Sequence, residues 1–249
     1  MATLNDRKQN LEDLPLSTTK NKKTRFNLFF KAGLHYGHLA KDWNPKMFKY
    51  IHSEYNGYHM IDLLQTDQAL KKAAKFTRVC AESKKTFLFI GTKKEASKVV
   101  AQQATRCGAF YVNHRWLGGM LTNWETMKKR IQRLKDLEKE EKTTNFSHLV
   151  KKEAAKKYKE LEKLRKYLNG VKHMEKLPDV VVVADQMHEL IGIKEAIGLK
   201  IPVICLVDTD ADPDLTFISV PGNDDTVKSL KVFYGVIANN IIKGYMKKI

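Results

Sequence analysis

The sequence predicts an α/β fold in which a parallel sheet, covered by helices on both faces, is interrupted by an inserted helical hairpin. Short runs that are apolar throughout, such as Phe87–Ile90 and Val180–Ala184, alternate with segments of helical periodicity. Strands of this kind are typical of parallel sheets that are buried on both faces. Between the runs, residues 124–176 place apolar side chains three and four positions apart among many lysines. That spacing is typical of paired amphipathic helices.

The N-terminal part of the chain precedes the alternating runs. Residues 26–32 form a short amphipathic stretch, and alternating patterns in residues 48–51 and 58–61 bracket an Asn-Gly pair at positions 56 and 57. Asn-Gly between two alternating runs is a strong short-range signal for a β-hairpin. Residues 62–83 repeat apolar side chains at helical spacing and therefore predict a helix.

The remaining elements follow a strand–helix rhythm on either side of the insertion. The predicted strands are 86–90, 109–112, 180–184, 202–207 and 217–220, and the predicted helices are 94–106, 188–198 and 225–243. Crossovers between parallel strands are right-handed in nearly all proteins, so we expect the same here.

The insertion is strongly basic. Residues 125–177 contain 17 Lys or Arg against 9 Asp or Glu, which is close to half of the chain's net charge of +17. Its apolar side chains form one narrow seam, which consists of Met127, Ile131, Leu134, Ala154, Tyr158, Leu161, Leu164 and Leu168. A break at residues 143–145 supplies a loop, so we predict an antiparallel helical hairpin with basic outer faces. The alternative is a solvated pair of helices that contacts no partner.

Composition restricts the class of protein. The 249 residues carry 45 Lys or Arg against 28 Asp or Glu, an excess that indicates a polyanionic partner, nucleic acid before anionic membrane. No uncharged apolar run approaches the roughly 18 residues of a membrane span. The three cysteines form no CxxC pair, which excludes a disulfide framework and a cysteine-only zinc site and indicates buried thiols.

The chain is predicted to divide into three parts. Residues 1–25 have neither the apolar core of a signal peptide nor the Arg-rich, acid-poor composition of a transit peptide, so we expect a flexible basic tail. Residues 26–123 and 178–249 are expected to form the α/β domain with its N-terminal hairpin. Residues 124–177 are expected to form the inserted helical hairpin.

Motifs of nucleotide-binding and hydrolytic enzymes are absent. Residues 91–94 follow a strand and open a helix, but GxxxxGK[ST] and GxGxxG are both missing, so the backbone cannot wrap a pyrophosphate. GxSxG is also missing, and no cysteine has an identifiable histidine partner. Lys93 and Lys94 can still meet a single phosphate of a polynucleotide at the helix N-terminus.

Two segments contain residue types that bind metals. Residues 208–214 hold four aspartates, but Pro213 and Ser219 stand where an EF-hand loop needs Gly and Glu. His35 and His38 are three positions apart, and a zinc site would need further ligands from distant residues such as Asp185 or Asp208. Hydrogen bonding or stacking on RNA is the simpler role for these histidines, so we expect no metal.

The densest functional signal is the segment Asn113–Trp124, which follows a predicted strand and so lies at the carboxyl edge of the sheet, where open α/β sheets bind ligands. His114 and Arg115 offer hydrogen bonds and guanidinium stacking, and Trp116 and Trp124 offer flat aromatic faces. This mixture is typical of sites that bind irregular RNA. The alternative is that both tryptophans belong to the core and that only Arg115 is exposed.

Nine segments stand in the order and spacing of one protein family. They are Gly33–His38, Trp43–Met47, Gly91–Lys93, Asn113–Asn123, Leu177–Asp179, Ile201–Val203, Val207–Thr209, Asp212–Asp214 and Pro221–Asp225. With them, the chain resembles the bacterial-type small-subunit ribosomal protein two family over about residues 26–243. The resemblance implies a Rossmann-like or flavodoxin-like sheet with an inserted coiled-coil hairpin, and a structural role without catalysis or a cofactor.

The resemblance also implies partners: small-subunit rRNA and neighbouring ribosomal proteins, including the large mRNA-binding ribosomal protein one, but no membrane and no small-molecule substrate. Residues 183–186 and 203–207 look like plastid members of the family, so we expect the chloroplast, with the bacterial cytoplasm as the alternative. A nucleotide-dependent enzyme on the same scaffold and a free mRNA-binding regulator remain as other functions. The residues that we expect to bind RNA are His35, His38, Trp43, Asn44, Lys46, Lys93, Lys94, Asn113, His114, Arg115, Trp116, Lys128, Lys129 and Arg130.

Overall fold

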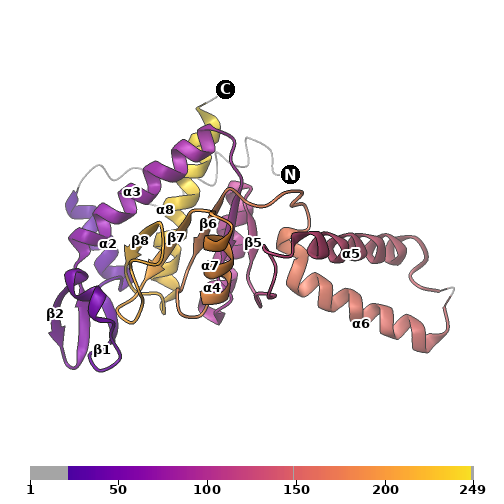
Figure 1. Cartoon of the computed structure of the whole chain (residues 1–249), viewed down its shortest axis with the longest axis horizontal. Coiled ribbons are helices and arrows are strands. Elements are labelled where there is room, and N and C mark those ends of the chain that lie inside the picture. Colours follow the sequence, from indigo (N-terminus) through magenta and orange to yellow (C-terminus); the bar gives the residue numbers. More distant parts are fainter. Residues whose placement is uncertain (1–21, 148, 248–249) are drawn as a thin grey trace.

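The computed structural model describes residues 22–147 and 149–247 and is built around a five-stranded parallel sheet. Its strands are β4 (Phe87–Ile90), β5 (Phe110–Val112), β6 (Val180–Val183), β7 (Val203–Val207) and β8 (Ile218–Pro221). They lie in the order β5-β4-β6-β7-β8 (Figure 1). Counted along the chain from β4, this is the 2-1-3-4-5 order of flavodoxin-like folds. The predicted α/β class is therefore confirmed.

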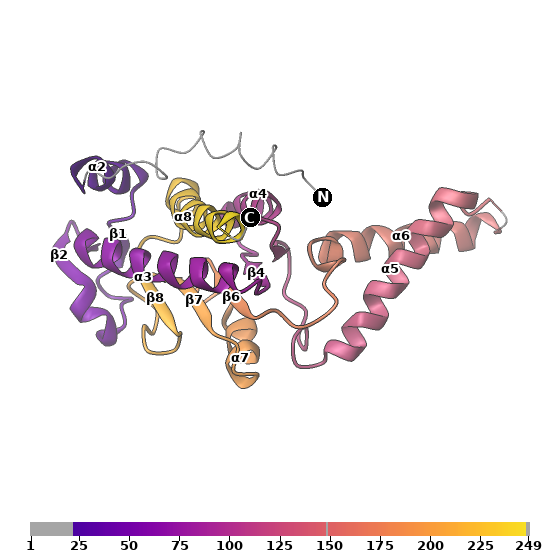
Figure 2. The same cartoon turned by 90° about the horizontal axis from the view of Figure 1, so that it is seen from above.

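Helices cover both faces of this sheet because its strands are apolar on both sides. On one face, α3 (Leu63–Glu82), α4 (Lys94–Cys107) and α8 (Val227–Met246) share a core with alternate strand residues such as Phe87 and Phe89. On the other face, α7 (Leu190–Gly198) and the segment after β5 pack on the remaining strand residues (Figure 2). The helices predicted at 62–83, 94–106, 188–198 and 225–243 are all confirmed.

A separate three-stranded antiparallel sheet precedes α3. Its strands are β1 (Tyr36–Leu39), β2 (Ile51–Tyr55) and β3 (Tyr58–Ile61), in the order β1-β3-β2. The predicted hairpin between β2 and β3 is confirmed, and both turn residues, Asn56 and Gly57, have positive φ, as a type I′ turn requires. The strand predicted at residues 48–51 is wrong in its first part: residues 48–50 belong to a 3₁₀ helix, η2 (Pro45–Tyr50), which begins with proline after the Asn44 cap.

The first described helix overlaps the predicted tail. Helix α2 (Lys22–Ala32) begins before residue 25, and the Arg25 guanidinium binds the Asp67 carboxylate of α3, with Nε 2.6 Å from Oδ1. The predicted boundary at residue 25 thus falls inside a helix. The rest of the predicted tail, residues 1–21, lies outside the described residues.

Two long helices lie in the predicted insertion and extend away from the sheet, at the end opposite the N-terminal sheet (Figures 1 and 2). They are α5 (Trp124–Thr144) and α6 (Lys151–Leu168), followed by the 3₁₀ turn η3 (Asn169–Val171). Buried side chains line their contact: Met127, Ile131, Leu134, Leu137, Leu161 and Leu168. This apolar cluster continues into the sheet core through Trp124 and Val171. The coiled-coil geometry and the division into domains stay predictions.

Two other expectations are met by the described residues. Cys80, Cys107 and Cys205 are buried free thiols, as their apolar surroundings predict. Within residues 22–147 and 149–247, no helix combines the length and the apolar character that crossing a membrane requires.

Candidate nucleic-acid interface

The segment from Asn113 to Asn123, here called the β5–α5 loop, is held by a single buried carboxylate. Glu195 of α7 accepts hydrogen bonds from Trp116 Nε1 at 2.9 Å and from the backbone amides of Gly119 at 2.8 Å, Leu121 at 3.0 Å and Thr122 at 3.2 Å. The Thr122 hydroxyl donates a fifth bond, at 3.2 Å. Burial opposes ionisation of Glu195, but these bonds outweigh it and hold the pKa of the carboxyl below its ordinary value. The loop is therefore fixed to the sheet by charge-assisted hydrogen bonds.

Both tryptophans of this segment are buried, which corrects the prediction that Trp116 offers a flat face to RNA. Trp116 is 9% exposed and Trp124 is 8% exposed. The Trp116 indole lies against Gly192 of α7, where a Cβ atom would come within 3.2 Å of the ring. The alternative stated for this segment is correct for the tryptophans, which belong to the core, but not for the rest of the segment, because His114 is exposed as well as Arg115.

The exposed side chains of the loop are cationic and face a groove. His114 and Arg115 are exposed. Arg115 lines a groove shared with α5 and α6, whose other polar lining residues are Arg130, Lys163 and Tyr167. Three cationic side chains of the groove have no carboxylate as an ion-pair partner among the described residues: Arg115, Arg130 and Lys163. Other cations on the same helices are paired, as Arg133 is with Glu160. The groove thus presents unneutralised positive charge beside an aromatic ring.

The predicted residues of the N-terminal part have partners within the protein. His35 is 6% exposed and stacks on Phe30, with ring centroids 4.4 Å apart. That burial contradicts the expectation that His35 contacts RNA. Trp43 packs edge-on against His59, and Asn44 caps η2 by accepting the Lys46 amide at 3.0 Å. Lys46 Nζ is 2.7 Å from Asp212 Oδ2. These contacts give the N-terminal candidates structural roles, and RNA binding by Trp43, Asn44 and Lys46 remains a prediction.

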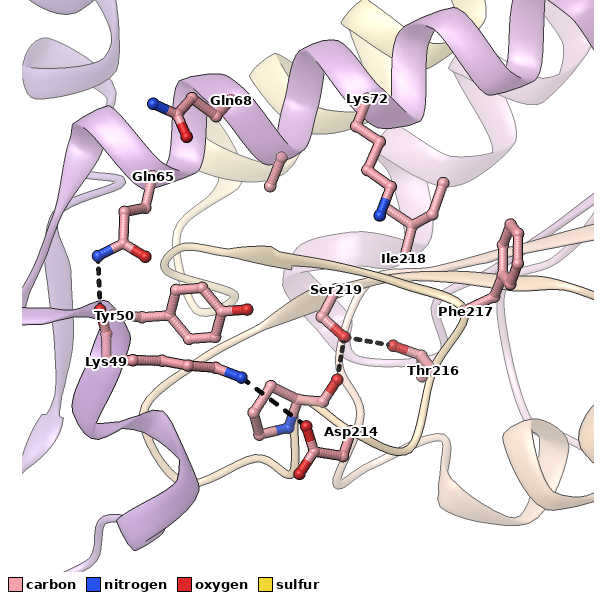
Figure 3. A pocket seen from close by; sticks show the side chains of 12 residues that line it. Lys49, Tyr50, Gln65, Gln68, Lys72, Asp214, Thr216, Phe217, Ile218 and Ser219 are labelled. Carbon is pink, nitrogen blue, oxygen red and sulfur yellow. Dashed lines mark hydrogen bonds and ion pairs between the residues drawn. The ribbon is translucent and has the colours of Figure 1, made fainter.

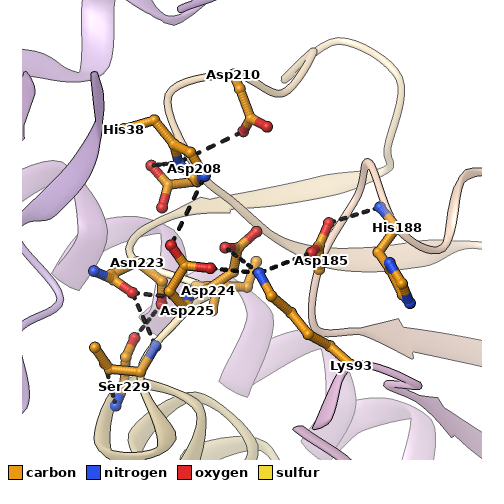
Figure 4. Close-up of polar contacts among 12 residues, drawn as sticks. His38, Lys93, Asp185, His188, Asp208, Asp210, Asn223, Asp224, Asp225 and Ser229 are labelled. Atoms are coloured by element: carbon orange, nitrogen blue, oxygen red, sulfur yellow. Dashed lines mark hydrogen bonds and ion pairs between the residues drawn. The ribbon is translucent and has the colours of Figure 1, made fainter. Parts of the chain in front are cut away.

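The two lysines after β4 have different surroundings. Lys93 Nζ lies 3.4 Å from Asp185 Oδ2 and 3.6 Å from Asp224 Oδ1, and it also binds Asp225 (Figure 4). Burial lowers the pKa of Lys93, but these carboxylates outweigh it and raise the pKa above its ordinary value. Lys94 is exposed at the start of α4. The charge of Lys93 is therefore shared among aspartates, whereas Lys94 remains available to a phosphate.

The place where a flavodoxin-like fold binds phosphate is already occupied by the protein's own side chain. In the 2-1-3-4-5 order, this crevice lies between β4 and β6. There, Glu189, which is 2% exposed, accepts the Thr92 amide at 2.6 Å. The Glu189 side chain thus binds the Thr92 amide, which in a nucleotide-binding protein would donate to a phosphate. The Asp185 carboxylate nearby would repel a phosphate as well. This arrangement disfavours the nucleotide-dependent enzyme.

The metal candidates named from the sequence are only partly brought together. His38 Nδ1 lies 3.2 Å from Asp208 Oδ1, and a group of possible ligand atoms within 4.8 Å of one another consists of His38, Asp208 and Asp224, not Asp185. The Asp208 carboxylate beside Nδ1 outweighs the opposing effect of burial and raises the pKa of His38 to about 9. Burial, followed by the charges of Asp208 and Asp185, raises the pKa of Asp224 to about 9. Asp224 could have been found as an aspartate shortly after β8, at the same sheet edge.

A hollow beside α3 has no catalytic arrangement (Figure 3). Its polar groups are bound to one another: Gln65 Nε2 donates to the Lys49 carbonyl, Thr216 and Ser219 share a hydrogen bond at 2.7 Å, and Lys49 Nζ is 3.8 Å from Asp214. Its lining includes no histidine or cysteine, and the Ser219 hydroxyl donates to the Pro213 carbonyl rather than to a base that could activate it.

Comparison with known proteins assigns the chain to a family. Residues 29–244 match the family Ribosomal protein S2. The small ribosomal subunit protein uS2c of Trieres chinensis is 55% identical over 214 residues, which cover 86% of this chain and 93% of that protein. The uS2c of Guillardia theta is 51% identical over the same share of this chain and 91% of its own length. The small ribosomal subunit protein uS2 of Prochlorococcus marinus (strain AS9601) is 54% identical, over 86% and 92%.

The matched region contains the whole five-stranded sheet, the β5–α5 loop and both helices of the insertion. At about half identity over nearly the full length of each relative, the chain belongs to the ribosomal protein S2 family.

Proposed function

We propose that this protein is a structural component of the small ribosomal subunit, that it binds small-subunit rRNA and neighbouring ribosomal proteins, and that it is not an enzyme. Its relatives carry the name of a small-subunit protein. The uS2c relatives, whose suffix denotes the chloroplast protein, support a chloroplast ribosome as its location.

The observation that carries the proposal is the cationic groove between the β5–α5 loop and the helices α5 and α6. Arg115, Arg130 and Lys163 line it together with Tyr167. Unpaired guanidinium and ammonium groups bind phosphate, and an aromatic or guanidinium plane can stack on an unpaired base. Because Glu195 fixes the loop from behind, this surface is formed before RNA arrives.

The test is a pair of measurements on the full chain. Sucrose-gradient fractionation of the native source should place the protein with small subunits at moderate salt. In titrations against small-subunit rRNA, the double variant Arg115→Ala/Arg130→Ala should lose affinity, and its salt dependence should flatten by about 0.7 in log–log slope for each lost phosphate contact on single-stranded RNA.

A control variant removes charge without touching the groove. Lys228 is an exposed lysine at the start of α8, on the opposite face of the sheet, so Lys228→Ala should leave the slope nearly unchanged. An equal effect of both variants would show that only net charge matters. If the protein does not sediment with small subunits but binds mRNA, the result would favour the alternative that it is a free mRNA-binding regulator.

A finer partner, the large mRNA-binding ribosomal protein one, is supported by an apolar surface on the N-terminal sheet. Phe30, Tyr36 and Tyr55 are 63%, 50% and 65% exposed around His35. Clustered exposed aromatic side chains are typical of protein interfaces. We expect Tyr55→Ser to weaken co-sedimentation of that protein with reconstituted subunits. Phe217→Ser, which changes an equally exposed ring elsewhere (60%), should have no effect.

A further inference from the structure

Helix α7 lies on the face of the sheet opposite α8 (Figure 2) and is apolar on its outer side as well as on its inner side. Its inward side chains include Ile193 and Ala196, which are buried in the core. On the outer side, Ile191 is 64% exposed and Ile197 is 39% exposed. A surface helix normally has polar residues on its outer face, and a helix that is apolar all round is normally covered. The outer side of α7 therefore has the composition of a surface that a partner covers.

A lysine stands in the middle of this outer side. Leu190, Ile191 and Ile197 are three or four positions away from Lys194, so on an α-helix they flank its side chain. Met187, which is 53% exposed, precedes Ile191 by four positions. We call these five residues the α7 surface. Lys194 is exposed, and no carboxylate in residues 22–147 or 149–247 forms an ion pair with it.

The two carboxylates of this segment are turned away from the α7 surface. Glu189 accepts the Thr92 amide, and Glu195 binds the β5–α5 loop. Both are buried, so the charges that residues 187–200 present to the outside come from Lys194 and Lys200 and are positive. Because Glu195 also ties α7 to the loop, the α7 surface is formed in advance, and little backbone ordering opposes the binding of a partner.

We propose that the α7 surface docks a neighbouring protein of the small subunit, through a segment in which apolar side chains flank an aspartate or glutamate. The apolar side chains cover Ile191 and Ile197, and the carboxylate pairs with Lys194. An ammonium group that becomes enclosed by apolar side chains needs a paired charge, which a carboxylate at the centre supplies. This inference rests on the proposed function and adds to it the surface that meets a protein and the chemistry of the segment that binds there.

RNA fits the α7 surface less well than it fits the cationic groove. A backbone phosphate could pair with Lys194, but the aliphatic side chains around it offer neither a hydrogen bond nor a flat ring on which a base could stack. The groove, in contrast, combines three cationic side chains with Tyr167. One turn after Lys194, a Cβ atom on Gly198 would meet open space, so the backbone of a protein segment can come close to the helix there.

The experiment is photo-cross-linking in small subunits. The full chain is made with a diazirine analogue of methionine at position 187, whose carbene inserts into protein and nucleic acid alike. It is bound to native small subunits from which concentrated salt, which screens charge, has removed the resident copy. We expect a product that nuclease does not shorten, in which mass spectrometry identifies a peptide of another ribosomal protein with a carboxylate among apolar residues. A product with RNA or with a second copy of this chain, or no product, overturns the proposal.

Sedimentation separates this result from the test of the proposed function. If the labelled chain does not sediment with small subunits, the proposed function and this inference both fail. If it sediments but gives no protein product, only the docking fails. The same analogue at position 163, in the cationic groove, should give an RNA product in the same subunits, which shows that the reagent reports both kinds of partner.

Variants test the two parts of the surface. With the analogue at position 187, Ile191→Ser and Lys194→Glu should each lower the yield of the protein product at least about fivefold, because changes at the centre of an interface have the largest effects. The matched controls are Val79→Ser, which changes an aliphatic side chain of α3 that is 53% exposed, and Lys200→Glu, which reverses a charge beyond the end of α7. Neither control should change the yield. An equal loss in the controls would show that the α7 surface is not the docking site.

All four substitutions are at exposed positions, so we expect each variant to fold, with a thermal midpoint within a few degrees of that of the native chain. Circular dichroism measures this before the variants are cross-linked.

Discussion

At the scale of single residues, Glu195 shows how one side chain prepares a surface that it does not join. Its carboxylate accepts bonds from donors 73 to 79 residues earlier in the chain. It was not among the residues named from the sequence. The available signal was a charged residue between Ile193 and Ala196 on the buried face of a short apolar helix. A carboxylate at such a position needs several donors, but only the fold reveals which segment provides them.

Replacing this carboxylate should loosen the loop. We expect Glu195→Gln to lower the free energy of unfolding by about 1–3 kcal/mol, because bonds to a charged acceptor are replaced by weaker ones. Affinity for rRNA should also fall, although Glu195 lies behind the groove. Urea unfolding and RNA titration measure the two effects. Glu125→Gln, at a residue whose side chain is 82% exposed, is the control, and an equal effect there would refute the positioning role.

The same carboxylate predicts a pH dependence. Its folded pKa lies below the ordinary 4.5, so the ionised form is favoured by folding. The stabilisation is fully present above about pH 4.5 and is lost as the pH falls through the folded pKa. The stability difference between the native chain and Glu195→Gln should therefore be constant from pH 6 to 8 and shrink below about pH 4.5. A difference that stays constant as the pH is lowered from 4.5 to the acid limit of folding would contradict this.

At the scale of elements, the helices α5 and α6 are held by a buried seam and by ion pairs across it. Arg133 pairs with Glu160 at 3.0 Å, Lys157 pairs with Glu140 at 2.5 Å, and Arg165 pairs with Glu138 at 3.3 Å. At the far end, Phe146 is buried edge-on against Tyr158. Most of the acidic side chains in these pairs face the partner helix, so the outer faces are left to lysines such as Lys129 and Lys156.

Shortening this pair of helices should separate folding from assembly. Replacing residues 136–164 with a short Gly/Ser linker removes Leu137, Phe146 and Leu161 together and leaves the base of α5 on the sheet core. We expect a cooperative thermal transition within a few degrees of the native chain, but poor incorporation into small subunits. Circular dichroism and gradient fractionation measure the two. Outright unfolding would show that the outer helices are needed for the core, and normal incorporation would show that they contact nothing.

The elements differ in how well the sequence predicted them. Strands β4, β6 and β7 are fully buried apolar runs, so local composition was sufficient to predict them. Strand β1 was missed because its four residues, Tyr36–Leu39, have no continuous apolar pattern; pairing with β3 and contact with Thr209 stabilise it. The loop's aromatic residues suggested RNA contact, but their burial against α7 depends on packing that a linear pattern does not encode.

At the scale of the whole molecule, charge is distributed unevenly between the helices α5 and α6, which project at one end of the longest axis (Figure 1), and the region where the two sheets meet. The cationic groove lies at the end that carries α5 and α6. Five aspartates lie instead around His38 and Lys93, where the two sheets meet; they are Asp185, Asp208, Asp210, Asp224 and Asp225. A polyanion is attracted to the first region and repelled from the second. We therefore expect the protein to bind RNA in a preferred orientation, with these five aspartates turned away from the phosphates.

The same polarity predicts that mononucleotides do not bind at the sheet edge. Glu189 occupies the Thr92 amide, and Asp185 and Asp224 line the neighbouring crevice. We therefore expect no saturable binding of ATP, GTP or NAD in the micromolar range by calorimetry, in a sample that binds rRNA. Saturable binding of one of these nucleotides would instead support the hypothesis of a nucleotide-dependent enzyme.

The sheet order also has a consequence for synthesis. Strand β6 lies between β4 and β7 in the sheet, but helices α5 and α6 precede it in the sequence and are synthesised first. Until β6 is made, β4 and β5 are the only strands of the parallel sheet in the nascent chain, and an isolated pair of strands is marginal in water. The lysine-rich helices are therefore exposed outside the exit tunnel before the centre of the sheet can close. Completion of the fold waits for the last third of the chain, and until then the most cationic segment of the polypeptide is exposed beside a half-built core.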